Sequence, residues 1–156
     1  MAPPPIQQAM MRIGVIVAAA ILAAFAASFA YVVFTGVVAT VAGLNQGVPM
    51  AFSDGFIAVV ILLHLSPVVF GIFLLGSFCA GIPTYLILRR LGQARLLTLA
   101  GAGALLSGLA AMAVFGALGP LAILPSPAAG AVGALIFRIV AEQMPWPLTP
   151  PPAPPS

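Results

Sequence analysis

Charged side chains are almost missing from this sequence. Only 4% of its 156 residues are charged, lysine is absent, and the two acids are Asp54 and Glu142. About a quarter of the residues in a soluble domain are charged, so this chain has too few polar side chains to cover a surface in water. The scarcity of charge excludes a soluble globular domain, and lipid is the expected solvent.

Reactive side chains are equally scarce, and their scarcity excludes several kinds of site. The single cysteine, Cys79, has no second cysteine with which to form an intrachain disulfide. The two acids fall on opposite sides of the membrane in the topology derived below, so they cannot act as a catalytic pair. The net charge of +3 would suit nucleic acid, but the few arginines stand at the ends of apolar runs, and we expect no nucleic-acid partner.

Long apolar runs are what the sequence has in abundance, since 63% of its residues are hydrophobic. About 20 apolar residues cross the ~30 Å hydrocarbon core as a helix. The runs predict an all-α integral membrane four-helix bundle with spans at residues 13–43, 55–88, 96–118 and 121–143, the last beginning among prolines. Between the spans we expect an external loop at 44–54, a basic cytoplasmic turn at 89–95 and an external proline-rich turn at 119–127. A proline-rich cytoplasmic segment at 1–12 and a disordered proline-rich cytoplasmic tail at 144–156 complete the chain.

The second run is too long for one straight span, because it would reach about 50 Å as a single helix. Proline removes a backbone hydrogen bond and bends helices, so we expect a kink at Pro67 or Pro83, with Pro83 favoured. Tyr85 would then lie at the level of the lipid headgroups, beside Arg89 and Arg90.

The arginines predict how the chain is threaded. With four spans, all five fall on one side of the membrane: Arg12, Arg89, Arg90, Arg95 and Arg138. Arginine collects on the cytoplasmic side, so both termini are expected in the cytoplasm and Asp54 outside. The absence of lysine beside abundant alanine, glycine, proline and arginine is typical of a GC-rich coding sequence. We therefore expect a multi-pass protein of a bacterial cytoplasmic (inner) membrane.

A secretory signal peptide is the alternative interpretation of the first run. Arg12, the apolar stretch behind it and the small residues AFA at 24–26 fit such a signal, and cleavage would leave three spans. Because the apolar run continues far past that point, we expect an uncleaved anchor.

His64 is the residue whose place in an apolar run raises the question of chemistry. Ionisable side chains inside spans are functional candidates, but His64 is expected near the outer interface beside Pro67, where water or a freed carbonyl satisfies its imidazole. A Ser–His–Asp arrangement would need Asp54, ten residues away, and no GxSxG motif is present. No set of metal ligands has suitable spacing. We assign no catalytic, cofactor-binding or metal-ligating residue and expect neither an enzyme nor a cofactor.

Two groups of charged residues predict contacts near the membrane surface. Arg138 and Glu142 are four apart and are able to pair on one helix face. The basic turn, with Arg89, Arg90 and Arg95, would attract an anionic lipid headgroup.

Small residues recur at a spacing of four in three of the runs. They are Ala19, Ala23 and Ala27; Ala100, Ala104 and Gly108; Gly103, Ser107 and Ala111; and Ala129 and Gly133. Such rows let helix backbones approach closely in lipid. They predict close packing within the bundle and would also suit a membrane-protein partner or a homo-oligomer.

The segment GIPTYLILRRLG, followed by a span of small residues, resembles a recurring segment of uncharacterised small four-span membrane proteins of bacteria. The resemblance implies a multi-pass membrane protein and transfers no activity. We therefore expect a non-enzymatic accessory, assembly or scaffold component of the membrane. The alternative is a small transporter or channel for a neutral or amphiphilic solute. It predicts a polar-lined cavity built from Thr35, Thr40, His64, Ser66, Ser77 and Ser107.

Overall fold

The computed structural model describes residues 5–47, 51–116, 119 and 123–143. They form the helices α1 (Pro5–Asn45), α2 (Ala51–His64), α3 (Ser66–Gly76), α4 (Ile82–Arg90), α5 (Leu96–Phe115) and α7 (Pro125–Gln143), with a π-helical turn η1 (Ser77–Gly81) between α3 and α4. No strand occurs in these ranges, and the predicted all-α class is confirmed. The tail at 144–156 and much of the predicted turn at 119–127 lie outside the described residues.

Within the described residues, three helical stretches are long and apolar enough to cross a membrane: Met10–Asn45, Ser66–Arg90 and Leu96–Val114. They correspond to the first three predicted spans. The fourth predicted span coincides with α7, which is not among these three stretches. Its 19 residues, Pro125–Gln143, include both partners of the ion pair between Arg138 and Glu142.

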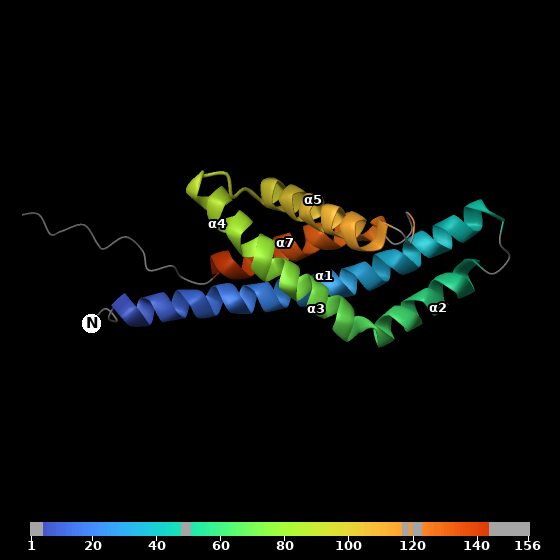
Figure 1. Ribbon diagram of the computed structural model, residues 1–156, viewed down its shortest axis with the longest axis horizontal. Helices are drawn as coiled ribbons and strands as arrows, with labels where there is room; N and C mark the ends of the chain where they lie inside the picture. Colours follow the sequence, from blue (N-terminus) through green and yellow to red (C-terminus); the bar gives the residue numbers. More distant parts are fainter. Residues whose placement is uncertain (1–4, 48–50, 117–118, 120–122, 144–156) are drawn as a thin grey trace, which may run out of the picture.

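Helix α1 runs the length of the molecule, and α2, α3 and α7 pack along it (Figure 1). Its N-terminal half packs against α7, and α5 packs on α7 in turn. Its C-terminal half pairs with α2 in a hairpin that projects beyond α5 and α7 (Figure 1). With 41 residues, from Pro5 to Asn45, α1 is longer than the predicted span at 13–43. Proline is well accepted in the first turn of a helix, so Pro5 does not prevent this early start.

The second predicted span is broken where its first proline stands. Helix α2 ends at His64 and α3 begins at Ser66, and Figure 1 shows the chain bending there. Pro67 has no amide hydrogen to donate, and the amides of Val68 and Val69 both bond to the carbonyl of Leu65, at 2.9 and 3.1 Å. Of the two predicted positions, Pro67 therefore carries the break.

The second proline has a different effect. Its ring would meet the carbonyl four residues earlier in a regular helix. Here the turn before Pro83 is widened into the π-helix η1, in which the amide of Ile82 bonds to the carbonyl of Ser77. Pro83 is thus accommodated without ending the helix, although the sequence favoured it as the break.

In the N-terminal half of α1, side chains are buried or exposed according to size rather than polarity. The buried positions between residues 19 and 28 are alanine or serine, with Ala19, Ala20 and Ala23 at 0 to 3% exposure, whereas Phe25 and Phe29 are 64% and 60% exposed. Lipid tails are as apolar as large side chains, so there is no drive to bury them, and close van der Waals packing of small residues holds the helices together. This arrangement is expected of a chain whose solvent is lipid.

Helices α5 and α7 approach each other closely at two glycines. A Cβ added to Gly103 would come within 2.5 Å of the Gly130 carbonyl oxygen, so only a glycine fits there. On the other side of α7, a Cβ on Gly133 would lie 3.0 Å from the Ala27 methyl group of α1. The predicted close packing is found along these faces, while the row of Ala100 and its neighbours four apart is only half-buried.

Candidate functional site

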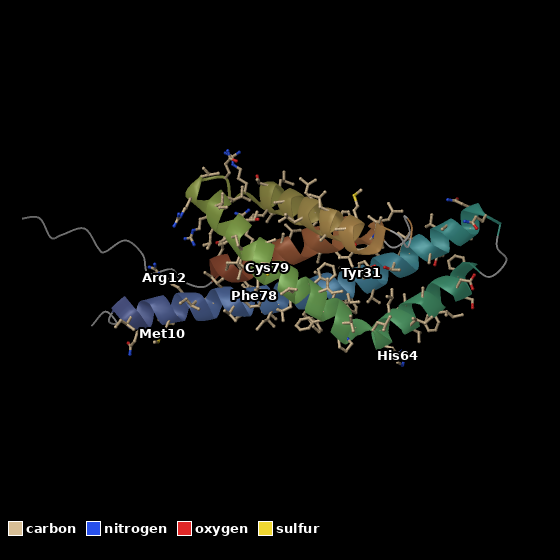
Figure 2. The ribbon with its side chains drawn as sticks, in the orientation of Figure 1. Met10, Arg12, Tyr31, His64, Phe78 and Cys79 are labelled. Carbon is tan, nitrogen blue, oxygen red and sulfur yellow. The ribbon has the colours of Figure 1, made fainter. Side chains whose placement is uncertain are left out.

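His64 lies at the bend between α2 and α3, where its side chain is exposed (Figure 2). Its Nδ1 is 2.9 Å from the carbonyl oxygen of Val60, one turn earlier in the same helix. Asp54 stands in the first turn of α2, about 15 Å from His64 along the helix axis. A Ser–His–Asp arrangement on these two residues is therefore not formed.

The remaining reactive groups are also separate. Cys79 is exposed on η1, and Glu142 lies in the last turn of α7, where its Oε1 accepts a hydrogen bond from Arg138 Nε at 2.9 Å. This ion pair confirms the predicted pairing four residues apart. Among the described residues, no three of the His, Cys, Asp and Glu side chains come together as metal ligands.

The helix ends that carry arginine gather at one end of the molecule. Arg12 lies near the start of α1 (Figure 2), Arg89 and Arg90 end α4, and Arg95 immediately precedes α5. Figure 1 shows these helix ends beside the C-terminal end of α7, which carries Arg138. The hairpin with the start of α2 lies at the opposite end. The molecule therefore has one basic end.

The segment Ser66–Arg90, made of α3, η1 and α4, is called the arm below. It contacts the rest of the molecule through two pairs of aromatic rings. Near its start, the Phe73 ring meets Tyr31 of α1 with ring centroids 6.0 Å apart. Near its end, Tyr85 meets Phe137 of α7 edge to face at 5.0 Å. Such aromatic pairs stabilise beyond the area they bury. Between these two aromatic contacts the arm has few contacts with α5.

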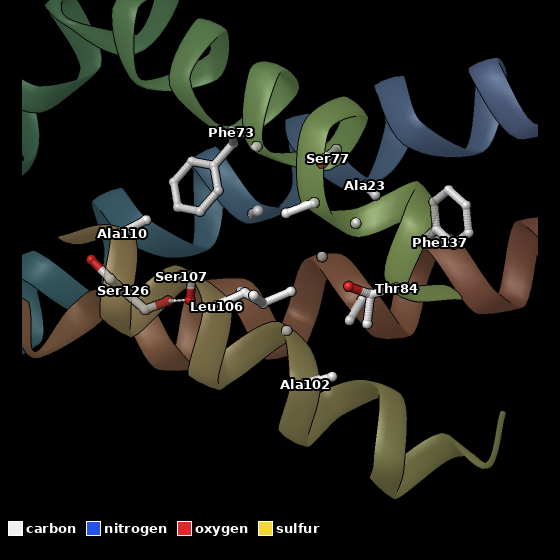
Figure 3. A pocket seen from close by; sticks show the side chains of 18 of the residues that line it. Ala23, Phe73, Ser77, Thr84, Ala102, Leu106, Ser107, Ala110, Ser126 and Phe137 are labelled. Atoms are coloured by element: carbon white, nitrogen blue, oxygen red, sulfur yellow. Dashed lines mark hydrogen bonds between the residues drawn. The ribbon is translucent and has the colours of Figure 1, made fainter. Parts of the chain in front are cut away.

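A pocket of about 220 Å³, called the interhelical pocket below, lies between the arm and α5. Alanine and glycine of α1 and α7 line its floor. Figure 3 shows Phe73 and Ala110 facing it at one end and Thr84 and Ala102 at the other. The pocket exists because the arm residues that face α5 here are small: Gly76, Ser77, Ala80 and Gly81. The two walls therefore stand apart between the two aromatic contacts.

The pocket lining is mostly apolar. Of the described residues, five contribute polar side chains to it: Ser77, Thr84, Tyr85, Ser107 and Ser126. The Ser107 hydroxyl is already engaged, since it donates to the backbone carbonyl of Ser126 at 2.6 Å (Figure 3). Ligand pockets commonly combine apolar walls with a few polar groups, and these walls suit a hydrocarbon better than a polar solute.

The polar-lined cavity that the sequence suggested is not assembled as expected. Of its six residues only Ser77 and Ser107 line the pocket. The hydroxyls of Thr35 and Thr40 bond instead to carbonyls of their own helix, at 2.8 and 2.9 Å, and His64 lies at the bend. Serine and threonine can satisfy themselves in this way, so their presence in a span does not predict a polar cavity.

Tyr85 is the site residue whose packing partners the sequence did not predict. Within the bundle it is 3% exposed, in a core cluster with Leu99, Phe137 and alanines of α1. Its ring partner stands 52 positions later, and no spacing pattern links the two. The signal that was available is the set of small residues Gly76, Ser77, Ala80 and Gly81, which marks where the arm leaves space.

Comparisons of the chain with known protein families, with curated proteins and with solved structures find no match.

Proposed function

We propose that the protein is a four-span protein of a bacterial inner membrane that works without covalent chemistry, by holding an amphiphilic guest in the interhelical pocket. The observation that carries this proposal is the pocket itself, a mostly apolar space of about 220 Å³ with few polar groups. In a membrane, the nearest molecules able to enter such a space are amphiphiles of the bilayer.

The proposed threading has both termini in the cytoplasm, and the basic end of the molecule supports it. Lysine and arginine are enriched on the cytoplasmic side. Helix α7 would be the fourth span, since its 19 residues reach about 28 Å, close to the ~30 Å core. Arg138 and Glu142 stand near its C-terminal end, where the charged pair can reach the headgroups.

The N-terminal part of α1 supports an uncleaved anchor. Ala19, Ala20 and Ala23 precede the AFA site at 24–26 and belong to the core cluster around Tyr85. Cleavage at that site would remove them and leave Tyr85 without part of its packing. The proposal therefore keeps α1 whole.

Pocket filling tests the proposed binding. Ala102 lines the pocket, whereas Leu105 on the same helix is 69% exposed and points away. A spin-labelled fatty acid added to the reconstituted protein should show an immobilised component in its spectrum. Ala102→Phe is expected to reduce that component severalfold and Leu105→Phe to leave it unchanged. An immobilised component of equal size in all three proteins would rule out the pocket as the site.

An accessory or assembly role is the second candidate, and the α1–α2 hairpin favours it. Phe52 and Phe56 of α2 are 74% and 70% exposed beyond the part of the molecule that α5 and α7 cover. Lipid alone accounts for the exposure of such side chains, so the observation that favours a partner is the position of this helix face, which α5 and α7 leave uncovered. A photoreactive amino acid at Phe56 should then crosslink to another protein or a second copy in native membranes. Recovery of uncrosslinked monomer alone would contradict this role.

A further inference from the structure

We infer that the guest is an anionic diacyl phospholipid that lays one acyl chain in the interhelical pocket and sets its phosphate against the arginine turn, residues 89–95. The inference rests on the proposed function and adds to it the chemical class of the ligand. It depends on three features of the molecule: the position of the turn, the length of the pocket and the charge at its mouth.

The arginine turn joins the two walls of the pocket. The wall residues nearest to it are Tyr85 in α4 and Leu99 in α5. Each is four residues, about 6 Å along the helix, from Arg89 and Arg95 respectively. The turn therefore caps the same end of the pocket at which Thr84 and Ala102 face each other (Figure 3). One lipid molecule can therefore place its headgroup at the turn and an acyl chain in the pocket.

The pocket is long enough for an acyl chain. Its lining on α5 extends from Leu99 to Val114, about 22 Å along the helix. One leaflet is about 15 Å deep, half of the ~30 Å core. No charged side chain among the described residues lines this length, and the polar lining residue of α5, Ser107, already donates its hydroxyl to the Ser126 carbonyl. A polar guest would lose hydrogen bonds along this path, whereas a hydrocarbon chain loses none.

The positive charge of the arginine turn, at the end of the pocket, favours an anionic ligand. Arg90 and Arg95 are exposed on the turn, and guanidinium groups match phosphate oxygens in shape and charge. The acid at this end of the molecule, Glu142, is bonded to Arg138 and so does not neutralise the turn. Each cation near an anionic lipid is worth about a fivefold factor in affinity. A zwitterionic phospholipid has the same chains but gains less from the turn.

Photolabelled lipids in nanodiscs of the full-length protein test the inference. The probes are phosphatidylglycerol and phosphatidylcholine with a diazirine near the end of one acyl chain. We expect phosphatidylglycerol to label peptides of α5 and of residues 72–81 and to outcompete phosphatidylcholine. Arg90→Gln with Arg95→Gln should weaken phosphatidylglycerol labelling about 25-fold, while Arg90→Lys with Arg95→Lys keeps the preference. Arg12→Gln removes a cation of the same end, away from the pocket, and should change little.

The outcomes separate the two proposals. Labelling of the pocket that ignores the headgroup and both arginines overturns the inference and leaves the proposed function standing. Labelling that Ala102→Phe does not reduce overturns both. Crosslinks in which the pocket holds a helix of another chain also overturn the inference, since the occupant would then be a protein. Each variant is compared only if it elutes as a single species and melts at the temperature of the wild type.

Discussion

Single glycines decide how closely α5 and α7 approach. The backbone of Gly103 faces Gly130, and a side chain on either residue would overlap atoms of the facing helix. Gly101, two positions earlier in α5, has no atom of a neighbouring helix within 4 Å of its Cβ position in the described part of the chain. The two glycines of one helix thus differ in their surroundings and not in their helix propensity.

Substitution of these two glycines by valine gives a matched test. Gly103→Val should lower the free energy of unfolding by about 1–3 kcal/mol, because the helices must separate to admit the side chain. Gly101→Val should have a small effect, since its side chain enters open space. Helicity followed during titration with a denaturing detergent measures both. If both variants lost the same free energy of unfolding, the helix propensity of the new residue, and not the α5–α7 contact, would explain the loss.

The hydrogen bond from Ser107 to the Ser126 carbonyl joins the same two helices. At 2.6 Å it links residues 19 positions apart. Ser107→Ala should cost about 0.6 kcal/mol, the average for interhelical hydrogen bonds in membranes, and at most about 1.7 kcal/mol. Ser53, exposed at the start of α2, is the control, and Ser53→Ala should cost less in the same titration. A loss at Ser53 as large as that at Ser107 would contradict the role of this bond.

The position of the arm depends on its two aromatic contacts, with Tyr31 and with Phe137. Between these contacts its small residues leave a gap to α5. Tyr85→Ala should release the end of α4 and cost about 3–5 kcal/mol, as for other large aromatic truncations in a core. Tyr85→Phe keeps the edge-to-face contact with Phe137 and should behave like the wild type. The exposed Leu86 is the control for truncation on the same helix.

The release is measurable as a change in distance. Spin labels at Ile87 of α4 and Ile139 of α7, both exposed, report the separation of the two helices once Cys79 is replaced by serine. In Tyr85→Ala the distance distribution should broaden toward longer values, and in Leu86→Ala it should not. An unchanged distribution in Tyr85→Ala would show that other contacts hold the arm.

The helices were predictable from the sequence, but the pairing between them was largely not. Apolar runs gave the helical stretches, Pro67 marked a break, and a spacing of four gave the Arg138–Glu142 pair, because each of these depends on neighbours in the chain. Which face of a helix packs inward is not encoded by polarity when the solvent is lipid. The contrast between buried Ala23 and exposed Phe25 is one of size, and the contact between Tyr85 and Phe137 depends on where the arm crosses α7.

The distribution of charge along the long axis gives the molecule two unlike ends. Arginine-bearing helix ends lie together, and the hairpin end carries the acidic start of α2. Moving one arginine to the centre of the bilayer costs about 2.5–3.5 kcal/mol on insertion scales. A threading that split the five arginines between the two sides would also oppose the cytoplasmic preference of each. The molecule therefore has a strong electrostatic reason to insert in one orientation.

Reporter fusions test that orientation. A fluorescent protein fused behind Ser156 should be bright, and alkaline phosphatase at the same site should be inactive, because the former matures in the cytoplasm and the latter outside it. Phosphatase inserted after Gly47, in the turn that follows α1, should be active. Replacing Arg89, Arg90 and Arg95 together by glutamine should make the C-terminal reporter signal mixed, since the turn then loses most of its cytoplasmic preference. If phosphatase were active both after Gly47 and behind Ser156 of the unchanged protein, the number of crossings between the two sites would be even. In that case α7 would not cross, and the arginine-rich end could not face one compartment.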